Sequence, residues 1–172
     1  MTNHEIYVVT ARHEDRENGQ IATWIMPATL VPDSPRIVAI LSQKNFTHSL
    51  IRHSGRFALN MLAEGQHDLV PLFGLVSGLE IDKFDGMELH RTSGGLPIIP
   101  GTCGWAECTV IASHDGGDRM IYIADIVEQN LVSSRKPLRK QDAFDALPAD
   151  IRLLLEEKHR LDGQRDSGLI KR

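Results

Sequence analysis

The sequence contains little cysteine and no recognisable metal-binding motif. Its two cysteines among 172 residues, Cys103 and Cys108, stand five positions apart without CxxC spacing. Structural zinc sites and disulfide-stapled folds need more thiols than this, or a paired spacing. Eight histidines are scattered, and the five positions between His48 and His53 do not place both side chains on one helix face. We therefore expect buried free thiols, no disulfide framework and no metal site.

Long hydrophobic runs are absent as well. No segment approaches the roughly 20 apolar residues that a membrane-spanning helix requires. Residues 1–5 carry no basic start and do not lead into the apolar stretch of a secretory signal. We therefore expect a cytoplasmic protein without a membrane-spanning segment.

An excess of positive charge is missing too. Nineteen lysines and arginines stand against 23 acidic residues, which gives a formal net charge of -4. The basic cluster at residues 135–140 is short and interrupted by Pro137. Because nucleic-acid binding needs a basic surface, we expect no nucleic-acid partner. A Ser-His-Asp grouping, a carboxylate pair or a nucleophilic cysteine does not stand out either.

The remaining composition is that of one soluble globular domain, with 41% apolar and 24% charged residues. Strand-like segments dominate, and turns join them more often than helices do. They are residues 6–10, 21–26, 37–41, 57–62, 105–111 and 120–127. Residues 15–19, which carry the Asn18-Gly19 signal, predict a tight turn after the first segment, and residues 113–118 predict one before the last. The pattern predicts a mainly β fold, an antiparallel barrel with short flanking helices.

Helices are predicted at three places. Residues 47–54 form a short helix that Thr47 would cap and Gly55 would end, and residues 66–76 form a second. From Pro148 onward the pattern changes to that of an amphipathic helix, and we divide the chain into a barrel domain, residues 1–140, and a C-terminal helical extension, residues 141–172. This extension is expected to pack on the barrel or on a partner subunit. Its amphipathic helix, ending near Gly163, would use Ile151, Leu154, Leu155 and Leu161.

The junction between the strand at residues 37–41 and the helix after it predicts an anion site. Lys44, Asn45 and Thr47 place an ammonium, an amide and a hydroxyl close to the predicted helix start. Backbone N–H groups and the partial positive charge of a helix N-terminus favour a phosphate monoester. The alternative is that Thr47 only caps the helix and Lys44 is only solvated. On these residues alone, both interpretations stay open.

A series of sequence blocks carries a family resemblance. The main blocks are residues 18–24, 44–48 and 55–62, and shorter ones follow at Phe73-Gly74, residues 82–84, Leu96-Pro97, residues 106–108 and Gly117-Asp118. In order and spacing, over residues 6–138, the chain resembles the flavin reductase-like proteins with the FMN-binding split barrel. The resemblance implies a split antiparallel barrel, FMN as cofactor and NADH or NADPH as co-substrate.

The resemblance also implies which residues surround the flavin. Residues 22–24 would lie along the flavin ring, and the loop at residues 44–47 would hold the phosphate. Trp24 and Phe84 could instead be core aromatics, and Lys83 a charge at a helix end. The implied cofactor-binding residues are Ala22, Thr23, Trp24, Ala28, Thr29, Lys44, Asn45, Thr47, Lys83 and Phe84.

Arg119 departs from the family pattern. Related reductases often carry Gly-Asp-His in the late hairpin, whereas this chain has Gly117-Asp118-Arg119. A guanidinium is permanently charged and pairs well with a dinucleotide phosphate, but it cannot act as a neutral imidazole. We assign Arg119 and Thr23 as the candidate catalytic residues. The alternative for Arg119 is an exposed turn residue.

These implications predict an NAD(P)H-dependent flavin reductase that transfers a hydride to FMN. Its electrons would pass to oxygen, to a monooxygenase or to another acceptor protein, or leave on free reduced flavin. The alternative is an FMN-binding electron carrier, similar to flavoredoxin, that a partner protein reduces; Arg119 favours this one. A third is a split-barrel protein for another ligand, such as haem. Because members of the family are commonly homodimers, a homodimer is also expected.

Overall fold

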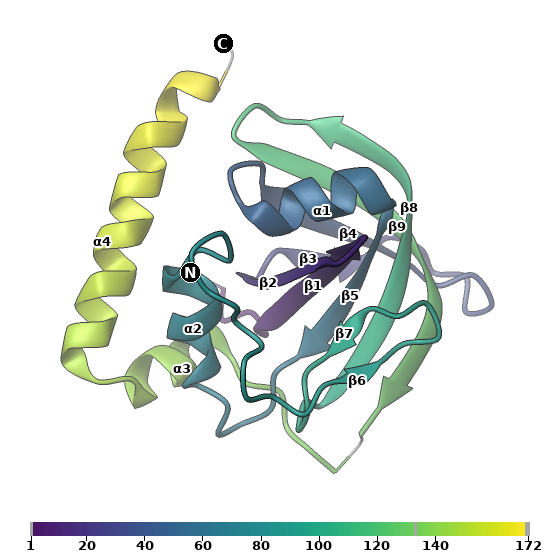
Figure 1. Cartoon of the computed structure of the whole chain (residues 1–172), viewed down its shortest axis with the longest axis horizontal. Coiled ribbons are helices and arrows are strands. Elements are labelled where there is room, and N and C mark those ends of the chain that lie inside the picture. The colour runs from purple at the N-terminus through teal and green to yellow at the C-terminus, as the bar shows by residue number, and fades with distance from the viewer. Residues whose placement is uncertain (1, 133, 171–172) are drawn as a thin grey trace.

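A single curled antiparallel sheet forms the body of the protein in the computed structural model, which describes residues 2–132 and 134–170 (Figure 1). Seven strands cross this sheet in the order β2-β1-β5-β8-β9-β4-β3. They are β1 (Tyr7–His13), β2 (Arg16–Ala22), β3 (Ile25–Pro27), β4 (Arg36–Ser42), β5 (Arg56–Met61), β8 (Gly104–Asp115) and β9 (Arg119–Leu131). A second small sheet pairs β6 (His90–Arg91) with β7 (Pro97–Ile98). The predicted mainly β, antiparallel split barrel is confirmed.

The helices lie on two sides of this sheet, as Figure 1 shows. The first, α1, packs Leu50 and Ile51 into the core inside the curled sheet. The others cover a second core on the outer side of β1 and β2. The helices are α1 (Phe46–Ser54), α2 (Leu69–Leu75), α3 (Lys140–Ala146) and α4 (Ala149–Asp166), and a 3-10 turn, η1 (Ser167–Leu169), follows α4.

Strand β1 shows how the sequence serves both cores. Successive side chains of a strand point to opposite faces, so a strand buried on both sides is apolar throughout. Val9 and Ala11 face the core inside the curled sheet, whereas Ile6 and Val8 face the second core under α2. The uninterrupted apolar run therefore reflects a strand that lies between two layers.

The predicted first hairpin is confirmed, and its turn lies at the start of the predicted residues 15–19. β1 and β2 are joined at Glu14 and Asp15, and Glu14 adopts a positive φ of 54°. Asn18-Gly19, which carried the turn signal, lies within β2, so the turn does not form at these two residues. Both residues are fixed by contacts remote in sequence: the Asn18 side chain bonds Thr47, and a Cβ on Gly19 would stand 2.8 Å from the Phe73 ring. Glycine serves close packing here and not a turn.

The late hairpin is confirmed and is longer than the sequence pattern indicates. β8 and β9 pair along most of their length, and residues 116–118 form the turn within the predicted 113–118. The predicted helix at residues 66–76 is found as the shorter α2, whose Phe73 is buried in the second core.

The C-terminal helix is present, but its predicted apolar face is only partly used. Ile151 and Leu155 pack against the second core, and α4 contacts α2 of its own chain. Leu154 and Leu161, predicted to share that face, are exposed. The helix also continues past Gly163 to Asp166. Among the described residues, no helix is both long and apolar enough to cross a membrane.

Candidate functional site

The candidate anion site lies where β4 ends at Ser42 and α1 begins at Phe46. Asn45 is the N-cap residue, so the prediction that Thr47 caps the helix is wrong by two positions. Thr47 is instead fully buried, and its hydroxyl accepts a hydrogen bond from the Asn18 side-chain amide at 3.0 Å. Because the Thr47 hydroxyl is bonded to Asn18 on β2, it does not cap the helix. Gly55 ends the helix at φ 69°, as predicted.

The polar groups at this helix start suit an anion. Lys44 is exposed, and within the described structure the Asn45 side chain makes no capping hydrogen bond, so its amide is not used by the helix. The first turn of α1 contains no acidic residue. The first N–H groups of a helix have no partner inside it and carry partial positive charge. An ammonium, an amide and backbone donors thus meet at one point.

Trp24 borders the same site from the link between β2 and β3. Its carbonyl accepts a hydrogen bond from the Ile40 N–H at 3.0 Å, two residues before the end of β4. Thr23 precedes it in this link and is half-buried. The Trp24 side chain is 49% exposed, so the alternative of a core aromatic is wrong. An exposed indole beside a phosphate-type site offers a flat surface for stacking.

Arg119 completes this group of residues. It is the register partner of Ser42 across β4 and β9, and its guanidinium carbon lies 5.9 Å from the centre of the Trp24 ring. The separation is within cation–π range. The structure therefore brings Arg119, Trp24 and the Lys44 loop together from three segments that are distant in sequence.

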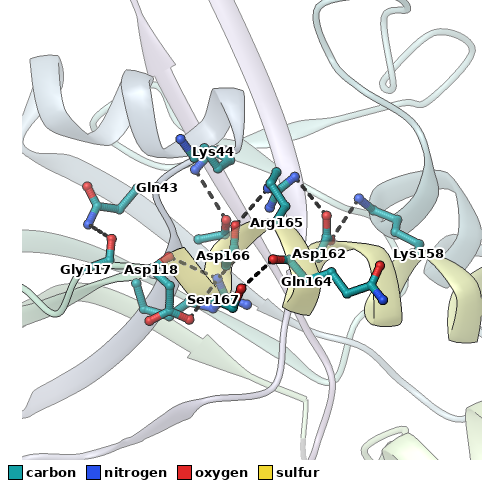
Figure 2. A network of polar contacts seen from close by, with 12 residues as sticks. Gln43, Lys44, Gly117, Asp118, Lys158, Asp162, Gln164, Arg165, Asp166 and Ser167 are labelled. Atoms are coloured by element: carbon teal, nitrogen blue, oxygen red, sulfur yellow. Dashed lines mark hydrogen bonds and ion pairs between the residues drawn. The ribbon is translucent and has the colours of Figure 1, made fainter. Parts of the chain in front are cut away.

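Polar contacts from the C-terminal helix reach the same place, as Figure 2 shows. Arg119 donates to the Asp166 carboxylate at 2.8 Å and to the Asp118 carbonyl at 3.0 Å. Gln43 donates to the Gly117 carbonyl at 3.0 Å, which ties the loop to the late hairpin. Hydrogen bonds from Arg165, despite burial, and from Arg119 hold the pKa of Asp166 below its usual value. Sequence reasoning missed Asp166, which lies in a polar tail outside every matched block.

Three other predicted residues lie apart from this group. Ala22 is buried in the core inside the curled sheet. The Ala28 N–H donates to the Arg36 carbonyl, so Ala28 and Thr29 lie at the opposite end of β4 from Lys44. That end is about 20 Å from Ser42 at the usual rise of a strand. Thr29 accepts a hydrogen bond from the Val31 N–H within its own loop.

An apolar cavity of about 240 Å³ lies beside β3, and no pattern in the sequence indicates it. Its walls come from β1, β3, β4, β5, β8 and β9, which meet only in the folded sheet. They include Tyr7, Ile25, Ile37, Leu59, Trp105 and Ile126. Such a cavity is suited to a flat apolar group.

Lys83 and Phe84 are both buried. Phe84 packs in the second core against Phe73, as the core-aromatic interpretation has it. The Lys83 ammonium donates to the Gly19 carbonyl at 3.0 Å and weakly to the Phe73 carbonyl at 3.4 Å. Burial, and to a lesser extent the charge of Lys158, lower the pKa of Lys83 to about 8.

Replacing Lys83 by methionine is expected to stabilise the protein by about 1 kcal/mol at pH 7 and to lose this advantage near pH 10. Between the folded-state pKa of about 8 and the usual 10.5, only the unfolded chain keeps the Lys83 proton. Wild-type stability therefore gains from Lys83 as pH rises through this window. Urea unfolding of both proteins at pH 7 and pH 10 measures the difference.

Subtracting the variant from the wild type removes contributions that both share, such as those of Cys108 and Tyr122, whose burial raises each pKa to about 12. Lys136→Met, at an exposed position, is the matched control. A stability difference that stays constant with pH would contradict the assignment of the pH effect to Lys83.

Comparison with known families gives one match over most of the chain. Residues 2–147 match the family described as "Flavin reductase like domain". The matched region ends just before α4 begins at Ala149.

Individual relatives carry related names. The chain is 31% identical over 135 residues to a high molecular weight rubredoxin of Moorella thermoacetica, covering 77% of this chain and 58% of that protein. It is 32% identical over 132 residues to HsaB, the reductase subunit of a flavin-dependent monooxygenase of Mycobacterium tuberculosis, covering 77% and 68%. It is 27% identical over 139 residues to a ferric-chelate reductase (NAD(P)H) of Archaeoglobus fulgidus, covering 80% and 81%.

Solved structures resemble the fold as well. An FMN-binding protein from Thermus thermophilus with bound p-hydroxybenzaldehyde superposes with a TM-score of 0.71 at 28% identity, covering 77% of this chain and 74% of that one. The region of similarity leaves part of this chain uncovered.

Proposed function

The chain belongs to the flavin reductase-like family, and from this membership we propose that it is an FMN-binding flavin reductase that oxidises NADH or NADPH. The observation that carries the proposal is the meeting of the Lys44 loop, the start of α1, Trp24 and Arg119 on one face. A relative named ferric-chelate reductase (NAD(P)H) and one named monooxygenase reductase subunit support it.

The residues at the start of α1 fit the phosphate of FMN. Lys44 supplies a charge, the Asn45 amide is not taken up by helix capping, and backbone N–H groups point out of the first turn. Each donates hydrogen bonds, as a phosphate dianion requires. Thr47 is proposed to support the phosphate site from behind, because its buried hydroxyl is bonded to Asn18.

The other residues would orient the two reactants. Thr23 and Trp24 offer backbone and side-chain groups along the flavin ring, and Arg119 offers hydrogen-bond donors to the diphosphate of the nicotinamide cofactor. We also propose that the flavin ring is lined by Ala22, Ala28 and Thr29, which lie apart from the Lys44 loop. Lys83 and Phe84 take no part in this proposal, since both are buried and the Lys83 ammonium is bonded to the Gly19 carbonyl.

FMN held at the Lys44 loop would supply the redox chemistry, taking up a hydride from NAD(P)H together with a proton from solvent, with NAD(P)⁺ as the oxidised product. The protein needs no acid or base of its own for this exchange, because the solvent supplies the proton. The acceptor of the two electrons would be oxygen, a monooxygenase or another acceptor protein. This chain's residues contribute positioning and charge.

We further propose a cytoplasmic homodimer. Met26 on β3 is 53% exposed and, in the loop after it, Leu30 is fully exposed and Val31 is 55% exposed. Apolar side chains gathered in this way are typical of a protein–protein contact. Sedimentation of the purified protein tests the dimer; a monomeric mass at micromolar concentration would overturn it.

Anaerobic addition of NADH or NADPH to the FMN-loaded protein tests the proposed function directly. We expect the visible absorbance of the flavin to bleach within seconds with at least one nucleotide and to return on admission of air. A protein that never takes up FMN would overturn both flavin-based functions.

The second candidate function is an FMN-binding electron carrier. The observation that favours it is the ion pair between Arg119 and Asp166 at the position where related reductases often have histidine. A carrier would bleach with a chemical reductant such as dithionite and would stay oxidised with both nucleotides. The same titration therefore separates the two functions.

A further inference from the structure

The C-terminal helix reaches the proposed site from outside the region that matches the family. The match ends at residue 147, whereas α4 spans Ala149–Asp166. Figure 1 shows α4 running along the side of the molecule, past α2 and toward the end of the β8–β9 hairpin. Ile151 and Leu155 fasten its first half to the second core. This packing places the last turn of α4 beside Arg119.

Asp166 at the end of this helix is a buried carboxylate between two arginines. Only 4% of its side chain is exposed. One oxygen accepts from Arg119 at 2.8 Å, and the other accepts from Arg165 at 2.8 Å (Figure 2). Charge-assisted hydrogen bonds to a group shielded from water are stronger than those at a surface and hold their partners in one orientation.

A backbone contact fixes the helix end independently of the ion pair. Gly117 in the hairpin turn has φ of 94°, and a Cβ there would stand 2.4 Å from the Leu169 carbonyl oxygen. Only glycine permits this approach. Through Gly117 the 3-10 turn after α4 is connected to Gln43 and so to the Lys44 loop.

Arg119 faces two carboxylates among the described residues. Its guanidinium pairs with Asp166 at 2.8 Å and with Asp118 at 3.4 Å. Two negative charges therefore stand against its one positive charge. Arg119 therefore keeps its orientation over Trp24 while much of its attraction for a further anion is cancelled.

From these contacts, and resting on the proposed function, we propose that Asp166 is a positioning residue that sets the charge and orientation of Arg119 and thereby favours NADH over NADPH. NADPH differs from NADH by a 2′-phosphate, which needs an uncompensated cation nearby. A neutralised arginine supplies hydrogen bonds for the diphosphate that both nucleotides share. It does not supply the extra positive potential that would attract the 2′-phosphate.

Steady-state kinetics of Asp166→Asn with both nucleotides test the proposal. We expect the ratio of kcat/KM for NADPH to that for NADH to rise about tenfold, mainly through a lower KM for NADPH. Asp166→Glu keeps the charge and is expected to keep the wild-type ratio. Melting temperatures and FMN affinity, measured alongside, verify that each variant is folded and loaded.

Asp162→Asn is the matched control. Asp162 lies on the same helix and pairs with Lys158 at 3.1 Å and Arg165 at 2.9 Å, and Arg119 pairs with Asp118 and Asp166 instead. Its replacement removes the same charge one turn away and is expected to leave the ratio close to that of the wild type. An equal change in both variants would overturn the proposal, because it would point to a general effect of charge.

A double-mutant cycle shows whether Asp166 acts through Arg119. In an Arg119→Ala background, Asp166→Asn is expected to change the nucleotide ratio by less than twofold. A tenfold change in that background would overturn the positioning role. A wild-type protein that binds FMN but is reduced by neither nucleotide would overturn the proposed function itself, a result distinct from a reductase whose preference ignores Asp166.

Discussion

Lys44→Ala is expected to raise the dissociation constant for FMN about 30-fold and to leave that for riboflavin within about twofold. A charge-assisted hydrogen bond contributes about 1.5 to 3 kcal/mol, and this range corresponds to about 10- to 150-fold in affinity. Lys44 is exposed and stands at a helix start without acidic neighbours in its first turn, so its ammonium is available to a phosphate. Riboflavin has the same ring and no phosphate, so it does not need this contact.

Quenching of flavin fluorescence on titration with the protein measures both constants. Lys136→Ala removes an exposed lysine elsewhere on the surface and is expected to change neither. Higher salt should weaken FMN binding to the wild type more than to the variant, because the attraction between charges is screened. Equal losses for FMN and riboflavin would contradict the phosphate assignment and would place Lys44 near the ring.

The sheet could be predicted from sequence because each strand has its own apolar pattern. The run at residues 37–41 became β4, and the two long segments around residues 113–118 became β8 and β9. Apolar runs and turn residues are local signals, and the fold preserves them. The turn signal at Asn18-Gly19 is equally local, but contacts with Thr47 and Phe73, which are distant in sequence, hold these two residues within β2 instead.

The candidate site was predictable only in part, for the same reason. Lys44 and Asn45 lie at a strand-to-helix junction that the sequence indicates directly. That Trp24 and Arg119 stand beside them depends on the register of β4 with β9, which no short motif encodes. Asp166 and Arg119 are 47 positions apart, and their contact joins the end of α4 to a hairpin, so no periodic pattern in the sequence predicts it.

A second buried carboxylate, remote from the site in sequence and role, stabilises the sheet. Glu107 on β8 is 3% exposed. It is paired with Arg56 on β5 and accepts a hydrogen bond from the Gly94 N–H at 3.2 Å. Burial opposes its ionisation, but hydrogen bonds from Thr92 and Arg56 prevail and lower its pKa below the usual 4.5. One side chain therefore joins two strands and a loop.

Glu107→Gln is expected to cost about 2 kcal/mol at pH 7 and to lower the melting temperature by about 6 °C. The cost lies below that of a fully buried pair, because the Arg56 side chain is 37% exposed and water screens it. The amide keeps the shape of the carboxyl group but leaves Arg56 without a counter-charge. Thermal unfolding followed by circular dichroism gives the difference.

The pH dependence of that difference separates charge from packing. A carboxyl group with a lowered folded-state pKa stabilises the protein above its unfolded-state pKa, and this contribution disappears as pH falls through the folded-state value. The gap between wild type and Glu107→Gln should therefore be full at pH 7 and shrink below pH 4. Glu157→Gln, in an exposed pair with Arg160 on α4, should leave the melting temperature unchanged. If the Glu107 gap persisted at acid pH, the loss would come from packing around the side chain, and the ion pair with Arg56 would contribute little.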